Sequence, residues 1–226
     1  MKRFYKDVTV ADDRSIHLDG KPILTPAMHK LTAPTRRLAE AFAQEWREQG
    51  SDIVPATMHL TKLANTAIDR TRRDDVIAEL TNFARNDLLC YRATEPAELV
   101  RRQQTAWDPL LDWTNATYGA PLATTHGVSH VAQDEAAIAA LSHAVQAADA
   151  WTLVGIHAAT TITGSLILAL AILENRLSHT EAFAASRIDE AFQSEKWGRD
   201  AEAEARARRL AAELEAASRF MALAGT

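Results

Sequence analysis

The most apolar stretch of the chain runs from Trp151 to Asn175 and ends in the unbroken apolar run Leu166 to Leu173. Its length suits a membrane span, which needs ~20 predominantly apolar residues. However, His157 and several Thr and Ser residues interrupt its first half. We therefore expect one buried helix and no membrane insertion. Because such a helix is apolar on all sides, other helices of the C-terminal half should surround it in a bundle.

The composition is that of a globular chain, and it excludes several classes of protein. Of the 226 residues, 47% are hydrophobic and 24% are charged, which is ordinary globular usage. Cys90 is the only cysteine, so an intramolecular disulfide framework is excluded and no cysteine zinc site is expected. Residues 1–98 hold 15 basic and 15 acidic side chains, and residues 99–226 hold 10 and 15. Because neither half offers a basic surface, we expect no binding of nucleic acid.

The chain opens with three short β-compatible runs, at Phe4 to Val10, Ser15 to Leu18 and Lys21 to Leu24. Asp19-Gly20 separates the last two runs. This dipeptide is a strong hairpin signal because both central residues of a type I′ turn need a positive φ. The pattern predicts a small antiparallel sheet, which needs helices on one face to bury enough apolar surface.

Three amphipathic helices are predicted after these strands, between Pro34 and Ala84, with Gly50 as the C-terminal cap of the first and Thr57 as a possible N-cap of the second. The short run Leu88 to Tyr91 is then expected to return to the sheet as a strand. Residues 1–95 therefore form the predicted α+β N-terminal domain.

Residues 96–226 show no further strong strand signal and are predicted to form an all-α helical bundle domain. Within it, Asp108 and Asp112 would share one helix face and could bind a metal or exchange a proton. The alternative is that Asp108 followed by Pro109 is the N-cap and first residue of a new helix that Gly119 ends. We favour the capping role for Asp108.

The helix predicted from Ser178 to Gly198 has two different faces. Ser178 and Glu181 form a capping box, and Gly198 suits its C-terminal end. At ~100° per residue one face is an apolar stripe that should meet the central helix: Ala184, Ile188, Ala191 and Phe192. The other face is aromatic and polar: Phe183, Ser186, Glu190, Gln193 and Trp197. A helix with two such faces has two sets of neighbours.

The last helix is predicted from Asp200 to Ala224, with a 3-4 repeat of apolar residues from Ala203 to Met221. Such a stripe could form a coiled coil with a partner. Because alanines make it weak, packing on the chain's own bundle is the favoured interpretation.

The sequence contains no catalytic or cofactor motif that we recognise. GxGxxG, GxxxxGK and GxSxG are absent. His126 and His130 have the spacing of zinc ligands, but they lie in a predicted loop and no glutamate stands between them as in HExxH. We therefore expect no catalytic residue, no cofactor and no metal, and the residues alone indicate an α+β head with a helical bundle that binds a partner.

Six motifs, in order along nearly the whole chain, resemble those of one family. They are FYKDV (Phe4–Val8), LDGKPILTP (Leu18–Pro26), MHLTKLANTAID (Met58–Asp69), DLLCYRA (Asp87–Ala93), WDPLLDW (Trp107–Trp113) and SRIDEAFQSEKWG (Ser186–Gly198). Together they resemble the assembly chaperone of the F1 sector of ATP synthase that acts on the alpha subunit. His59 departs from the Pro of that family's MPLT motif, which affects only the local start of a helix.

The resemblance implies a non-enzymatic chaperone that binds newly made alpha subunit through its nucleotide-binding region and shields the surface that beta subunit later covers. A functional acidic residue in the family's DE-x-x-Q segment falls here on Asp189 or Glu190, and Glu190 is favoured for its face. With Phe183, Gln193 and Trp197 it is expected to form the alpha-binding surface.

The expected state is a monomer. Because no secretory signal or organelle presequence is visible at the start of the chain, we expect a cytoplasmic protein if it is bacterial. Eukaryotic relatives would act in the mitochondrial matrix.

Two other functions remain open at this point. One is a carboxylate-dependent hydrolase, with or without a divalent metal, that uses Asp108, Asp112 and Glu190, which would have to converge in a cleft. The other is a scaffold that dimerises through the last helix.

Overall fold

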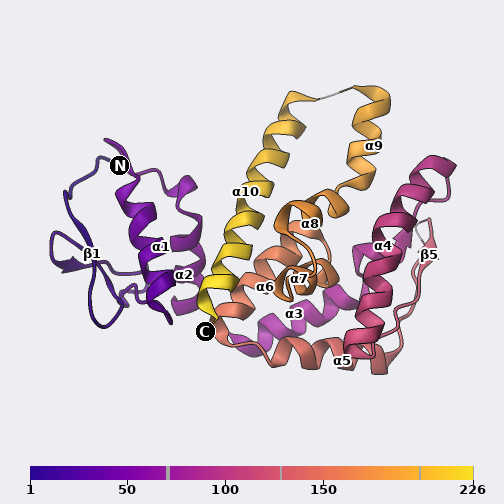
Figure 1. Cartoon of the computed structure of the whole chain (residues 1–226), viewed down its shortest axis with the longest axis horizontal. Coiled ribbons are helices and arrows are strands. Elements are labelled where there is room, and N and C mark those ends of the chain that lie inside the picture. Colours follow the sequence, from indigo (N-terminus) through magenta and orange to yellow (C-terminus); the bar gives the residue numbers. More distant parts are fainter. Residues whose placement is uncertain (70–71, 128, 199, 226) are drawn as a thin grey trace. The chain divides into compact units, whose positions relative to one another are not determined.

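The computed structural model describes residues 1–69, 72–127, 129–198 and 200–225 (Figure 1). The chain forms two compact units. Unit 1 comprises Met1–Arg73, Asp149–Gly155 and Ala216–Thr226, and unit 2 comprises Asp74–Ala148 and Ile156–Glu215. The predicted fold class, α+β with a small N-terminal antiparallel sheet, is confirmed. The part predicted to be all-α is mostly helical, because it also contains the short strand Thr125–His126. The predicted division into domains at residue 95 stays a prediction. Each of the two compact units combines segments from before and after that residue.

The N-terminal sheet is antiparallel and has the order β1 (Val8–Val10), β2 (Ile16–Leu18) and β3 (Lys21–Pro22). Asp19 and Gly20 connect β2 to β3 with φ values of 47° and 78°. Both are in the left-handed region that a type I′ turn needs, so the predicted hairpin is confirmed.

Helix α1 (Arg36–Arg47) begins at an N-cap threonine but does not end as predicted. Its C-cap is Glu48 in a right-handed conformation, not Gly50. The reason is that Gln49 donates a side-chain hydrogen bond to the Glu45 carbonyl (3.1 Å). A free carbonyl of the last turn is satisfied in this way without a left-handed glycine.

Helix α2 (His59–Asp69) is capped from outside its own sequence. Thr57, the predicted N-cap, ends the 3-10 helix η1 (Pro55–Thr57) instead. The carboxylate of Glu45 on α1 accepts the backbone N–H of Thr61 (2.8 Å). A long-range carboxylate therefore replaces the local cap, and its burial raises the pKa of Glu45.

The core of unit 1 joins the sheet and α1 to parts of two later helices, α6 (Ala150–Thr163) and α10 (Ala201–Ala224). The ring of Phe42 lies 6.5 Å from that of Trp151 and 6.2 Å from that of Phe220. Gly155 is needed at this contact, because a Cβ there would lie 2.2 Å from the Met221 side chain. The first turns of α6 and the last turns of α10 therefore belong to unit 1.

Unit 2 is built mainly of helices. Its elements, apart from its shares of α6 and α10, are α3 (Arg73–Arg85), the 3-10 helix η2 (Leu88–Cys90), β4 (Tyr91–Arg92), α4 (Ala97–Tyr118), β5 (Thr125–His126), α5 (Glu135–Gln146), α7 (Leu166–Leu173), α8 (His179–Ser186) and α9 (Ile188–Trp197). The strand predicted at Leu88–Tyr91 is wrong in its first residues and in its partner. It is largely η2, and β4 pairs in parallel with β5 and not with the N-terminal sheet.

The apolar segment is two helices, not one. Gly164, with a φ of 73°, ends α6, and the hydroxyl of Ser165 accepts the Leu168 N–H as the N-cap of α7. The buried carboxylate of Asp87 also accepts the Ile167 N–H (3.2 Å), so a distant acid supports the break. The expectation of burial is confirmed for α7, where the residues from Leu166 to Ile172 are at most 5% exposed. Within the described ranges, no helix is both long enough and apolar enough to span a membrane.

Helix α4 is continuous through Pro109, so the prediction that Asp108 is an N-cap is wrong. The proline removes only the backbone N–H that would donate to the carbonyl of Thr105, which is an exposed residue. On the opposite side, Trp107 and Leu110 are buried and hold the helix in place. Asp108 pairs instead with the buried Arg92 (2.8 Å). The predicted end at Gly119 is confirmed by its left-handed conformation.

Candidate functional site

The helix predicted from Ser178 to Gly198 is broken at Arg187 into α8 and α9 (Figure 1). The predicted capping box is present at its start, and Gly198 follows its end. The break has a tertiary cause, because Trp107 of α4 donates its indole N–H to the Ala185 carbonyl (2.9 Å). That carbonyl is thereby diverted from the helical ladder, and the chain changes direction two residues later.

Helix α9 is held against α4 by one buried aromatic ring. Phe192 is 4% exposed, and the cationic groups of Arg102 and Lys196 each lie 5.3 Å from its centroid. Glu98 of α4 also pairs with Lys196 (3.5 Å) and Arg102 (2.7 Å). Because both cations also contact carboxylates, these contacts hold the inner face of α9 against α4.

The two acidic residues left open by the sequence point in different directions. Asp189 accepts a hydrogen bond of 2.6 Å from the amide of Gln103, which is itself 1% exposed. The Gln103 carbonyl in turn accepts the Ala93 N–H (2.8 Å). Glu190 is half-exposed and pairs with Arg187 (2.9 Å). Asp189 therefore anchors α9 to α4, and only Glu190 faces outward.

A groove of about 480 Å³ lies between α8, α9 and the first turns of α10. Four of the five candidate residues line it: Phe183, Glu190, Gln193 and Trp197. Trp197 is 79% exposed. It is the only exposed large hydrophobic side chain in the part of unit 2 that the structure describes. We call this surface the α9 groove. It combines a solvent-exposed indole with a carboxylate that is already paired.

Sequence reasoning missed part of the α9 groove. Arg187 and Ala203 line it, but the first was not singled out and the second was assigned to a stripe packed inside the bundle. The predicted core stripe is also partly wrong, because Ala184 and Ala191 are exposed while Ala182 and Ala185 are buried. The break at Arg187 rotates the two helix halves relative to each other, and a stripe drawn through one continuous helix fails there.

The two units differ strongly in charge. Unit 2 contains 20 acidic and 11 basic residues, a formal net charge of −9, whereas unit 1 contains 10 and 14, a formal net charge of +4. The α9 groove belongs to the acidic unit. A partner with a basic surface would therefore be attracted to the unit that carries the groove.

The three carboxylates of the hydrolase hypothesis are not brought together. Asp108 pairs with Arg92 and Glu190 with Arg187, while Asp112 is exposed on α4. In the described part of the chain, no three His, Cys, Asp or Glu side chains are grouped so as to hold a metal ion. The arrangement offers a surface for contact and no convergent acid and base.

Comparison with known proteins identifies a group of similar chains. Residues 2–115 match the family model described as ATP12 chaperone protein. The mitochondrial protein atp12 of Schizosaccharomyces pombe is 21% identical over 215 residues, which cover 87% of this chain and 74% of the relative.

Two solved structures are similar over almost the whole chain. Atp12 from Paracoccus denitrificans is 41% identical, with a TM-score of 0.91 and coverage of 99% of this chain and 98% of the other. The Atu1473 protein from Agrobacterium tumefaciens is also 41% identical, with a TM-score of 0.94 and coverage of 98% and 85%.

Proposed function

The chain belongs to the ATP12 chaperone family, and on that premise we propose that it binds the unassembled alpha subunit of F1 through the α9 groove. A chaperone role in ATP synthase assembly follows from the membership itself. The finer proposal is that the groove contacts the nucleotide-binding region of alpha and shields the surface that beta later covers. The observation that supports it is the exposed indole of Trp197 beside Phe183 and Glu190 in one groove.

The physics of assembly explains why such a surface is useful. An unassembled ring subunit exposes an interface with more apolar area than a monomer tolerates. Large aromatic side chains are the groups that contribute most to transient interfaces. No energy source is needed to release the chaperone. If beta binds the same surface of alpha more tightly than the chaperone does, beta displaces the chaperone by mass action.

The proposed function is not enzymatic. It uses Glu190 for recognition, and the ion pair with Arg187 orients the carboxylate at the edge of the groove. We propose that the chaperone acts as a monomer, in the cytoplasm of a bacterium or in the mitochondrial matrix of a eukaryote. The hydrolase is not proposed, because its carboxylates lie apart.

The test is selective capture. The purified chain is immobilised and exposed separately to alpha subunit and to beta subunit of F1. We expect alpha to be retained and beta to pass through. Addition of beta to the complex of chain and alpha should then elute alpha as an alpha and beta assembly. Selective retention of beta, or equal retention of both, would contradict the proposal.

A further inference from the structure

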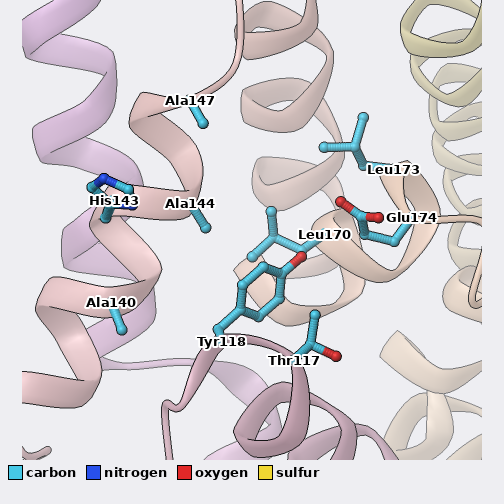
Figure 2. A pocket seen from close by; sticks show the side chains of 9 residues that line it. All are labelled: Thr117, Tyr118, Ala140, His143, Ala144, Ala147, Leu170, Leu173 and Glu174. Atoms are coloured by element: carbon cyan, nitrogen blue, oxygen red, sulfur yellow. The ribbon is translucent and has the colours of Figure 1, made fainter.

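A second pocket of unit 2, of about 450 Å³, lies where three helices end (Figure 2). Its walls come from the last residues of α4, from α5 and from the end of α7. We call it the helix-end pocket. Its apolar lining includes Ala144, Leu170 and Leu173, and its polar groups include Tyr118, His143 and Glu174.

The phenol of Tyr118 is an unusual part of this lining. Its hydroxyl is buried and has no hydrogen-bond partner in the described part of the chain. Figure 2 shows the hydroxyl directed into the pocket, toward the side where Glu174 lies. Burial and the nearby Glu174 carboxylate raise the pKa of Tyr118 to about 12, so the group stays a neutral hydroxyl. A buried polar atom without a partner is costly, and a ligand that donates to its oxygen would remove that cost.

Among the residues that the structure describes, the carboxylate of Glu174 also has no partner. It is exposed at the end of α7, and it makes no ion pair or hydrogen bond with the side chains that the structure describes. In the α9 groove, by contrast, the carboxylate of Glu190 is paired with Arg187. Glu174 is therefore an available negative charge beside a buried acceptor.

The backbone adds to the same field. Helix α4 ends at Tyr118, α5 at Gln146 and α7 at Leu173, and residues of all three ends line the pocket. Each helix C-terminus carries a partial negative charge that favours cations. Helix α5 has His143 in its last turn, but neither α4 nor α7 has a basic residue there. Two helix ends without a basic residue and one carboxylate therefore point to a cationic ligand.

We propose that the helix-end pocket is a docking site for a basic side chain, lysine or arginine, of the client polypeptide. The cationic head pairs with Glu174, and the Tyr118 oxygen accepts one of its N–H groups. The alkyl stem packs on Leu170 and Leu173, as long basic side chains pack on apolar surface while their heads stay polar. The net charge of −9 on unit 2 favours the approach of such a client. The identity of the client as alpha subunit rests on the proposed function, but the chemistry of the pocket does not.

The chemistry is tested with a small probe on the whole chain. n-Butylguanidinium and the neutral n-butylurea are titrated separately while backbone amide shifts are followed by NMR. We expect Ala144, Leu170 and Leu173 to shift with the cation, and the shifts to be lost in Glu174→Gln and reduced in Tyr118→Phe. Equal shifts with the neutral urea, or no shift at these amides with either probe, would overturn the inference.

The docking role is tested with alpha subunit. Glu174→Gln should weaken alpha binding roughly fivefold, the scale of a partly exposed ion pair. Glu215→Gln, an exposed glutamate on α10, is the matched control and should bind as wild type does. If alpha binds wild type and Glu174→Gln equally, the pocket is not a docking site and the proposed function stands. If alpha does not bind wild type, the proposed function fails and the NMR titration alone decides the chemistry of the pocket.

Discussion

The α9 groove and the helix-end pocket both belong to unit 2, yet they offer a partner different kinds of contact. The groove presents an indole that is 79% exposed and a carboxylate that Arg187 already neutralises. The pocket presents a buried hydroxyl and the carboxylate of Glu174, which has no partner among the described residues. Apolar aromatic contact supplies most affinity in transient interfaces, while unpaired charge supplies orientation and specificity. We therefore expect the groove to supply most of the binding free energy and the pocket to set the orientation of the bound alpha subunit.

The largest expected effect concerns the support of the pocket. Asp87 holds the start of α7, and burial raises its pKa to about 6. Because the folded-state pKa lies above the unfolded value, the protonated acid contributes stability at low pH, and this contribution is lost as pH rises through about 6. Relative to Asp87→Asn, the wild-type free energy of unfolding should fall by about 2.4 kcal/mol between pH 4 and pH 7.

Urea unfolding of both proteins at each pH measures this difference. Asp112→Asn, at an exposed site on α4, is the control and should leave the pH dependence of wild type unchanged. If the difference between wild type and Asp87→Asn does not change with pH, burial does not raise the pKa of Asp87 and this prediction is wrong.

The next effect concerns the binding affinity that the groove supplies. Trp197→Ala should weaken alpha binding about 30-fold, the equivalent of about 2 kcal/mol for an aromatic residue at the centre of an interface. Its thermal midpoint should stay that of wild type, because the side chain is exposed. Phe4→Ala removes another exposed aromatic side chain, in unit 1, and should bind normally. Equal losses in both variants would mean that binding follows exposed aromatic surface in general.

A smaller effect separates the two neighbouring acids. Glu190→Lys should weaken alpha binding about tenfold and leave stability close to wild type, because a surface pair such as Arg187 with Glu190 contributes only a few tenths of a kcal/mol. Asp189→Ala should retain binding but lower the free energy of unfolding by about 1 kcal/mol, since it leaves the buried Gln103 amide unpaired. Calorimetry and binding on the same samples would expose a reversed pattern, which would exchange the two roles.

The smallest effect is a difference in salt dependence. Raising the ionic strength screens the unpaired Glu174 more than the neutralised groove. Alpha binding by wild type should therefore weaken a few-fold more between low and physiological salt than binding by Glu174→Gln. Parallel salt curves for the two proteins would mean that Glu174 makes no charge-dependent contribution to binding, and the proposed difference between groove and pocket would fail.

Local signals in the sequence predicted much of this architecture. The Asp19-Gly20 hairpin, the Ser178 capping box and the left-handed Gly119 were all readable because each depends on neighbours in the chain. Four of the five candidate residues also fall in one groove. Three of them, Glu190, Gln193 and Trp197, lie on α9 at i, i+3 and i+7 and share one face, whereas Phe183 lines the groove from α8.

The failures share one physical cause, which is hydrogen bonding from distant residues. The break at Arg187 depends on Trp107, the break before α7 on Asp87 and the cap of α2 on Glu45. None of these contacts has a sequence pattern. The helix-end pocket was missed for the same reason, because its residues come from the ends of three helices and are unremarkable in each one.

The central claim is that the α9 groove covers alpha until beta takes its place, and hydrogen exchange of the chaperone tests it most directly. Exchange is compared for the chain alone, for its complex with alpha, and after beta is added. We predict slower exchange in residues 183–197 and 201–207 in the complex and a return to the free rates when beta assembles with alpha. Protection confined to other segments, or protection that persists after the alpha and beta assembly forms, would contradict the account.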